Sequence, residues 1–389
     1  MYSKMEKLSL IKNKRSVFFS LSFLLTAYLF ARPTFAFEFE PIFSVNNFSL
    51  FTHDPLTDKR YFINFNRLRA DLTLSNDWLK FHLIADNENY RSEKKIVYLS
   101  TPGENLPVDI HHDVFTDSKW INRFYLYRAY TQAEVLNSTV SLGLQRVPFG
   151  VGRLWTPTDT FNPLNSVSLE PGEREGILGA IWTMYFGDFT RIMAVTAADD
   201  EWNAGKNSLH IKSFIFNMDM GATYVHSKDF QMAGYEIESN FFKTGAEIRS
   251  EGGYFFDINN EDDFFKGILG LDRSFGEKFF AALEYLYNSA GESDKKRYPL
   301  FPKDPLLFGN LARHYIGAIL NYLPDPLLTL SLATTINLND SSFFLSPSVS
   351  YSFSDNGTLS TGALLFEGQN GAEYGSLEPT YFLRIDWFF

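Results

Sequence analysis

The chain has 389 residues, no cysteine and a formal net charge of −11. The absence of cysteine excludes disulfides and thiolate metal sites, and the acidity argues against a nucleic-acid partner. With 40 Phe and 20 Tyr, the sequence holds more aromatic side chains than one soluble core usually hides. Much of the surface is therefore expected to face an apolar environment.

The first 36 residues are predicted to form a secretory signal peptide. Five basic residues precede the apolar run VFFSLSFLLTAYLFA at 17–31, and Thr34 and Ala36 supply a small-x-small cleavage site. The alternative is a membrane anchor, but 15 residues fall short of the roughly 20 that span a bilayer as a helix. Cleavage after Ala36 would leave 29 basic and 45 acidic residues, a net charge of −16, in one expected domain, 37–389.

Alternation of apolar and polar residues predicts β-strands along the rest of the chain. In LRADLTL (68–74) the apolar positions alternate with Arg69, Asp71 and Thr73, and the same period recurs at 79–86, 327–338 and 342–355. Such runs are long enough to cross a bilayer when tilted. A soluble β-sandwich also alternates, but charged faces opposite aromatic-rich faces favour a membrane barrel.

Short turns alternate with longer connections, such as those near 51–60, 87–119 and 149–175. This order predicts an all-β, transmembrane, antiparallel up-and-down β-barrel with short periplasmic turns and long extracellular loops. We expect eighteen strands, from a weak strand near 43–50 to a closing strand at 379–389. Sixteen is the alternative, if 43–50 and one weak run between 189 and 240 are not strands.

Two residues fit this pattern poorly. Pro347 lies inside an expected strand and predicts a bulge, because proline cannot donate to the ladder. Arg146 continues the outward parity of Val140 and Leu142, which predicts either a position at the membrane interface or a preceding bulge.

The polar faces supply the candidates for the lumen wall. These candidates are Arg67, Arg69, Lys80, Arg128, Glu134, Glu236, Lys243, Glu247, Arg249, Arg384 and Asp386, together with Asp71, Asp86, Glu238, Glu251 and Glu284. Such charges imply water in the lumen, and their mixed sign predicts no strong ion selectivity. The alternative is that they pair and brace the wall.

The stretch QRVPFGVGRLWTPTDTFNPLNSVSLEPGEREG (145–176) contains a long connection, 149–175, that is rich in proline and aromatic residues. This composition indicates a fixed shape rather than a mobile tether. Its place in the topology makes it the third extracellular loop, which in general porins folds into the barrel and narrows it. By that resemblance, the expected constriction residues are Arg153, Asp159, Glu170, Glu173, Arg174 and Glu175. A surface cap or a partner contact is the alternative.

The pattern G-x-G-R-L-W-x-P-T-D-x-F-N-P at 150–163 also resembles segments of porin-like barrels, some of which accompany multihaem cytochromes. The chain itself has no CxxCH and is expected to carry no cofactor. The alternating, aromatic end TYFLRIDWFF (380–389) resembles the C-terminal signal read by the outer-membrane assembly machinery, with Tyr381, Trp387 and Phe389 as its residues.

An enzymatic function is not expected, because no G-x-S-x-G occurs and the seven histidines are scattered. The polar groups 111–113 and 199–201 are typical of solvated loops rather than metal sites. The expected function is passive diffusion of small hydrophilic solutes or ions through a Gram-negative outer-membrane porin; the alternative is the sheath of a porin–cytochrome electron conduit. Expected partners are outer-membrane lipid and lipopolysaccharide, the assembly machinery and, by the same resemblances, two further copies in a homotrimer or a multihaem cytochrome.

Overall fold

The computed structural model describes residues 36–54, 59–94, 103, 106–165, 167–241, 244–256, 262–299 and 310–389. The chain divides into two units, Met1–Glu38 and Phe39–Phe389, and the second unit is the barrel described below. Residues 1–35, which hold most of the expected signal peptide, lie outside the described residues.

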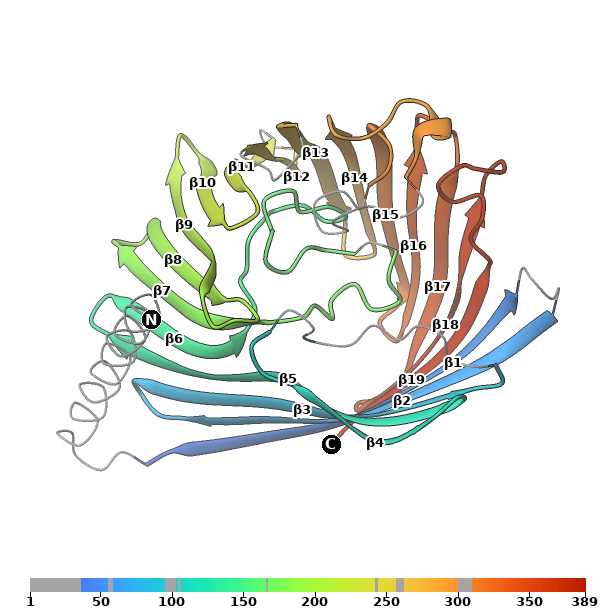
Figure 1. Cartoon of the computed structure of the whole chain (residues 1–389), viewed down its shortest axis with the longest axis horizontal. Helices are drawn as coiled ribbons and strands as arrows, with labels where there is room; N and C mark the ends of the chain where they lie inside the picture. Colours follow the sequence, from blue (N-terminus) through green and yellow to red (C-terminus); the bar gives the residue numbers. More distant parts are fainter. Residues whose placement is uncertain are drawn as a thin grey trace, which may run out of the picture. The chain divides into compact units, whose positions relative to one another are not determined.

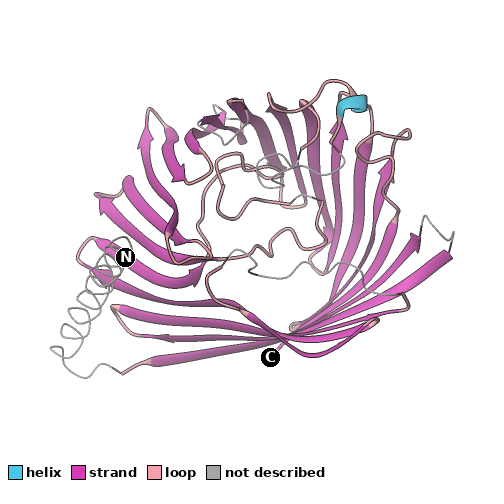
Figure 2. Ribbon diagram, in the orientation of Figure 1, coloured by secondary structure: helices cyan, strands magenta, loops and turns pink. Residues whose placement is uncertain are grey.

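Nineteen strands form one sheet within the described part of the chain (Figure 1). Their bounds are β1 Glu38–Asp54, β2 Lys59–Ser75, β3 Leu79–Ser92, β4 His111–Asp117, β5 Trp120–Val135, β6 Ser138–Gln145, β7 Ile177–Phe186, β8 Thr190–Ala198, β9 Ala204–Ile215, β10 Met218–Ser227, β11 Gln231–Phe241, β12 Ala246–Phe256, β13 Phe264–Phe275, β14 Phe279–Asn288, β15 His314–Asp325, β16 Leu328–Asn337, β17 Phe343–Ser354, β18 Gly357–Glu367 and β19 Thr380–Phe388. Figure 2 shows a wall made of strands, with one short 3-10 helix, Lys295–Arg297, among the described residues. None of the helices described is long and apolar enough to cross a membrane.

The sheet closes on itself. β19 pairs antiparallel with β1 in a continuous register from Ser44↔Phe388 to Thr52↔Thr380, and every other wall strand pairs with its neighbours in sequence. Closure leaves no free edge in the wall, so all of its backbone groups can be satisfied without water. The predicted barrel of eighteen strands is thereby confirmed, since β4 stands apart from the wall.

β4 lies outside the closed ring of eighteen strands and, among the described strands, pairs only with β5. It forms a hairpin with the first half of β5, whose second half pairs with β6, while β3 pairs with β5 along its length. Sequence alternation did not reveal this strand, because 87–119 reads as one polar connection. Its first part, 87–92, in fact continues β3.

The first strands are also longer than the periodicity indicates. β1 and β2 each have 17 residues and leave only 55–58 between them, whereas a connection at 51–60 was predicted. The prediction of a bulge at Pro347 was wrong. Pairing of β17 with β18 pauses at Ser346 and Pro347 and resumes at Ser348↔Gly362 in the same register, because losing one donor does not require an extra residue.

Large apolar side chains cover the outward face. Leu68, Leu209, Leu269 and Leu283 are each more than half exposed, and each lies opposite a polar or small lumen-facing neighbour in sequence. The buried apolar clusters lie instead inside the barrel, where the connection between β6 and β7 meets the wall. The molecule therefore has an apolar exterior and a partly filled interior.

Candidate functional site

Residues 146–176, here called the inner segment, connect β6 to β7 and run through the interior of the barrel (Figure 1). The segment contacts the β12–β14 wall on one side of the lumen and the β2 and β19 wall on the other. All of its residues except Ser166 are described. An inward loop was one of two expectations for this segment, beside a surface cap or partner contact, and specific wall residues hold it inside.

The first anchor is Glu251 on β12, whose side chain is fully buried. One carboxylate oxygen accepts hydrogen bonds from the Val151 N at 2.7 Å and the Gly152 N at 3.1 Å. The other oxygen accepts from both the backbone N and the hydroxyl of Thr158, each at 2.7 Å. A charged acceptor serving four donors holds this turn firmly against the wall.

The second anchor is Glu284 on β14, which accepts from three successive backbone N–H groups. The distances are 2.5 Å from Arg153, 2.8 Å from Leu154 and 3.3 Å from Trp155. The Leu154 and Trp155 side chains then pack in a buried cluster with Ile268, Leu286, Ala312 and Tyr315. The carboxylate fixes the backbone while the side chains fill the space below it.

The turn between the two anchors requires glycine. A Cβ on Gly152 would lie 1.7 Å from the Trp155 carbonyl oxygen, and Gly150 has a φ of +83°. Only glycine adopts both the close approach and the left-handed conformation without strain. The G-V-G of the sequence is thus a structural element of this turn.

The returning half of the inner segment carries acidic residues to the opposite wall. Glu170 lies 3.1 Å from the Arg67 guanidinium on β2 and 3.6 Å from that of Arg384 on β19. Glu173 lies 2.8 Å from Arg69, which also pairs with Asp86 at 2.7 Å. Burial alone would raise the pKa of Glu173, but the hydrogen bond and charge of Arg69, with the charge of Arg67, lower it overall.

A third set of contacts closes the inner segment on itself. Asp159, almost fully buried, accepts from the backbone N–H groups of Phe161 and Asn162 and pairs with Arg174 at 3.2 Å. Burial raises the pKa of Asp159 to about 6, although the Asn162 hydrogen bond and the Arg174 charge oppose that rise. Burial likewise lowers the pKa of Arg174. Asn162 Nδ2 donates to the Glu175 carbonyl oxygen and completes the closure.

The expected constriction residues are therefore all on a segment inside the barrel, but most of their charges are paired. Arg153 is the most exposed of those in ion pairs and lies 3.1 Å from Asp272 on β13, which also pairs with Arg249 at 2.8 Å. Glu175 accepts the Asn162 hydrogen bond through its backbone carbonyl oxygen.

The predicted wall residues are distributed around the lumen. Glu236 pairs with Lys212 at 3.0 Å, Glu247 with Arg249 at 2.9 Å, and Arg384 with Asp386 at 2.7 Å. Lys80 lies on β3 and Glu134 on β5, whereas Lys243 lies outside the described residues. Within the described ranges, no group of three His, Asp or Glu side chains could hold a metal ion.

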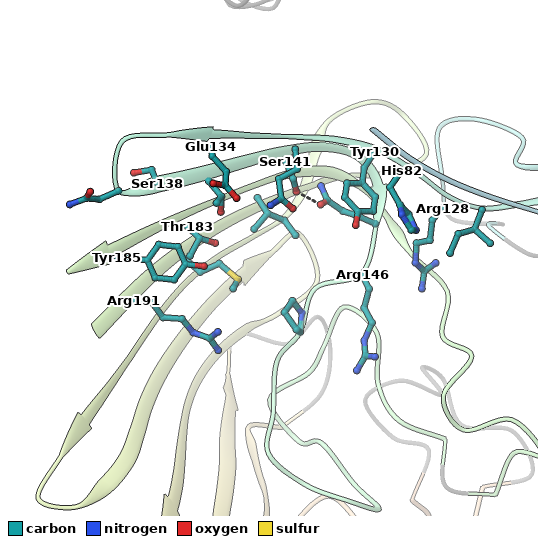
Figure 3. A pocket seen from close by; sticks show the side chains of 18 of the residues that line it. His82, Arg128, Tyr130, Glu134, Ser138, Ser141, Arg146, Thr183, Tyr185 and Arg191 are labelled. Carbon is teal, nitrogen blue, oxygen red and sulfur yellow. Dashed lines mark hydrogen bonds between the residues drawn. The ribbon is translucent and has the colours of Figure 1, made fainter. Parts of the chain in front are cut away.

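A cavity of about 670 Å³, here called the basic cavity, lies between the inner segment and β3, β5, β6, β7 and β8. Figure 3 shows Arg128, Arg146 and Arg191 entering it from three different elements, with His82 and Tyr130 nearby. Glu134 is the one acidic residue among those that line it. The cavity therefore carries an excess of positive charge, in contrast to the paired charges elsewhere in the lumen.

The arginines of the basic cavity are held mainly by neutral groups. Arg128 donates to the carbonyl oxygens of Tyr127 at 2.6 Å and Arg174 at 2.5 Å, and its guanidinium lies 3.9 Å from the centroid of the Tyr127 ring, so its direct contacts are with neutral groups. The buried Nε of Arg191 has no hydrogen-bond partner among the described residues. Arg146 reaches the cavity because β6 ends at Gln145 and the chain turns inward, so its outward parity no longer applies.

Sequence reasoning missed Arg191 for a physical reason. It shares its lumen face with Met193, Val195 and Ala197, which pack in the buried cluster against Phe149 and Phe161 of the inner segment. The inward face of β8 is thus mostly apolar, and the rule that polar faces point inward selects the wrong side. Only knowledge that a loop fills this part of the lumen would have identified the residue.

No protein-family model matches the chain, and no curated protein matches its sequence. Solved structures that match in fold include OccAB4 of Acinetobacter baumannii, with a TM-score of 0.57, 12% identity and coverage of 90% of this chain and 98% of that chain. OccK5 (OpdH) of Pseudomonas aeruginosa matches with a TM-score of 0.56 and 12% identity, over 90% of this chain and 98% of that chain. OpdK of the same organism, in a structure with vanillate, matches with a TM-score of 0.53 and 10% identity, over 90% of this chain and 98% of that chain. A second matching structure is that of the outer membrane protein OpdK. The fold is accordingly that of Gram-negative outer-membrane porin-like barrels.

Proposed function

We propose that this chain is a channel of the Gram-negative outer membrane, through which small solutes diffuse passively with a preference for anions. The apolar exterior of a closed wall supports the membrane location, since such a surface is stable only against lipid. The observation that carries the proposal is that the inner segment is bonded to opposite sides of the barrel wall. Beside it lies a cavity whose lining has more basic than acidic residues.

The inner segment supports a size limit. It meets the wall on opposite sides of the lumen through Glu251 and Glu284 on one side and Arg67 and Arg69 on the other. A solute must therefore pass beside a fixed obstacle and not through an open tube. No bond is made or broken in this mechanism, and we assign no catalytic residue.

The basic cavity supports the preference for anions. Mixed charge along the lumen predicted no strong selectivity, but most of that charge is paired, whereas the lining of the basic cavity holds Arg128, Arg146 and Arg191 and a single acidic residue, Glu134. Fixed cations in a confined aqueous space raise the local concentration of anions. The OpdK structure with vanillate, a small aromatic carboxylate, agrees with such a substrate class in a barrel of this fold.

The sheath of an electron conduit is the weaker alternative. A sheath has to leave room for a haem protein, whereas the inner segment occupies this lumen and packs in two buried clusters against the wall. No feature of the described residues favours a guest in that space.

Uptake by proteoliposomes tests the proposal. The refolded barrel should admit vanillate faster than the uncharged analogue vanillyl alcohol, and the double variant Arg146→Ala/Arg191→Ala should lose that difference. Lys212→Ala is the matched control, because Lys212 is a lumen cation already paired with Glu236. A folded barrel that admits neither solute would contradict the channel, and equal rates in the wild type would contradict the anion preference.

A further inference from the structure

A group of uncharged polar residues lies on the outward face of β1, β2, β3 and β5. This polar patch consists of Asn47, Ser49, Asn64, Asn66, Asn87, Asn89 and Asn122. Strand parity sets its direction: their neighbours Asn46, Arg67, Asp86, Glu88 and Arg123 are buried in the lumen. The patch therefore faces away from the pore and takes no part in the proposed passage of solutes.

Apolar side chains lie on both sides of the polar patch along β1, β2 and β5, whereas on β3 the patch continues into Arg91. On β1 it is flanked by Val45 and the half-exposed Phe51, and on β2 by Leu68 and Phe62. The ring centroids of Phe51 and Phe62 are 5.0 Å apart, and the two rings form an apolar border along one side of the patch. On β5, Asn122 lies between Trp120 and Phe124. This face would thus present amides to lipid tails, which cannot accept or donate hydrogen bonds.

The amides are partly satisfied by each other. Asn47 Nδ2 donates to Asn66 Oδ1 at 2.5 Å, and Asn66 Nδ2 donates to Asn64 Oδ1 at 2.6 Å. Asn87 and Asn122 exchange bonds of 3.3 and 3.4 Å. Asn64, Asn87 and Asn122 use their remaining N–H groups on Ser49 or on strand carbonyl oxygens. Asn47 and Asn66 each make one described bond through Nδ2, so one N–H of each, together with second lone pairs of the amide oxygens, keeps capacity for a partner in front of the patch.

The chemistry of the patch selects its partner. It contains no charged residue; Arg91 lies at its border, over the Trp120 ring at 4.5 Å. A surface for lipopolysaccharide phosphates would need cations, and a charged protein would need opposite charges. Amides instead complement amides, because each group is both donor and acceptor.

We propose that the polar patch is the contact face of a dimer of this chain, with the two copies related by a two-fold axis through the patch. A two-fold contact brings a surface against itself, as a self-complementary amide patch allows. A ring of three would need two different complementary surfaces, so the patch favours two copies over the homotrimer that general porins suggest. Interchain amide bonds would hold the copies together in lipid. The inference rests on the outer-membrane location proposed above.

Single-cysteine variants test the contact directly, since the natural chain has no cysteine. In outer membranes treated with a mild oxidant, Asn66→Cys should become a covalent dimer that a thiol reductant reverses. Ser250→Cys, outward on β12, should remain monomeric. A covalent product with a different protein would overturn the proposal, and so would a monomer from Asn66→Cys together with a wild-type mass of one chain in the measurement below.

A second measurement covers the case of a poorly placed thiol. Light scattering of the detergent-extracted wild type should give the mass of two chains, and Asn66→Leu/Asn89→Leu the mass of one. Ser250→Leu/Thr361→Leu, with outward changes on β12 and β18, should keep the wild-type mass. Equal masses for all three proteins would contradict the dimer. Membrane fractionation and heat-modifiable gel mobility report location and folding separately, so failure of the membrane proposal is distinguishable from failure of the contact.

Discussion

Glu251 illustrates how one buried carboxylate can hold a loop. Its two oxygens receive four hydrogen bonds from Val151, Gly152 and Thr158. In Glu251→Gln only one oxygen remains, and the new NH2 group faces donors, so the anchor should weaken by roughly 3 kcal/mol. We expect larger and noisier single-channel currents. Glu236→Gln, a buried wall glutamate paired with Lys212, should leave the current steps unchanged; the same noise in both variants would contradict the anchor.

Asp159 should make the pore respond to pH. Its pKa is raised to about 6 by burial, against the charges of Arg174 and Arg146. Because this pKa is raised in the folded state, ionisation opposes folding, and the group's contribution to stability falls as the pH rises from about 4 to about 6. Below pH 6 the carboxyl is neutral and leaves the charge of Arg174 uncompensated.

The measurement is the reversal potential in a salt gradient as a function of pH. Wild-type channels should become more anion-selective as the pH falls through about 6. Asp159→Asn, which keeps an acceptor for Phe161 and Asn162, should show the anion-selective value throughout. An identical pH dependence in the variant would assign the titration to another group.

At the scale of the element, the inner segment depends on its tight turn. Gly152→Ala would place a Cβ 1.7 Å from the Trp155 oxygen, so Arg153–Trp155 should move away from Glu284. We expect faster protease cleavage within the segment and a higher conductance. Gly172→Ala is the matched control in the same segment, because a Cβ there meets nothing within 4 Å. Equal cleavage of both variants would show that the turn does not hold the segment.

The elements also show what the sequence could predict. Alternation and the order of short and long connections predicted the strands of the wall and their number, because these depend on local periodicity. An inward third loop was expected only by resemblance to general porins. The anchoring role of Glu251 and Glu284 was out of reach, since parity placed both inside but only the register shows which loop amides they meet. β4 was missed because 87–119 reads as one connection, and the apolar lumen face of β8 was missed because the inner segment covers it.

At the scale of the whole molecule, closure of β19 on β1 should decide whether the barrel exists. Deleting 380–389 would expose the edges of β1 and β18, so the chain should lose heat-modifiable gel mobility after refolding. Phe389→Ala removes an exposed ring next to a retained backbone bond to Phe43 and should refold normally. If Phe389 belongs to an assembly signal, the same variant should accumulate poorly in outer membranes. A truncated chain that still forms a heat-modifiable barrel would contradict this role for closure.

Single-channel recording of the purified protein alone tests the central claim most directly. In a planar bilayer with a potassium chloride gradient, the account predicts stable open steps and a reversal potential displaced toward chloride, because Arg128, Arg146 and Arg191 outnumber the acidic groups of the basic cavity. The displacement should shrink in Arg146→Ala/Arg191→Ala. Silence from a barrel whose folding is shown by heat-modifiable mobility would contradict the account.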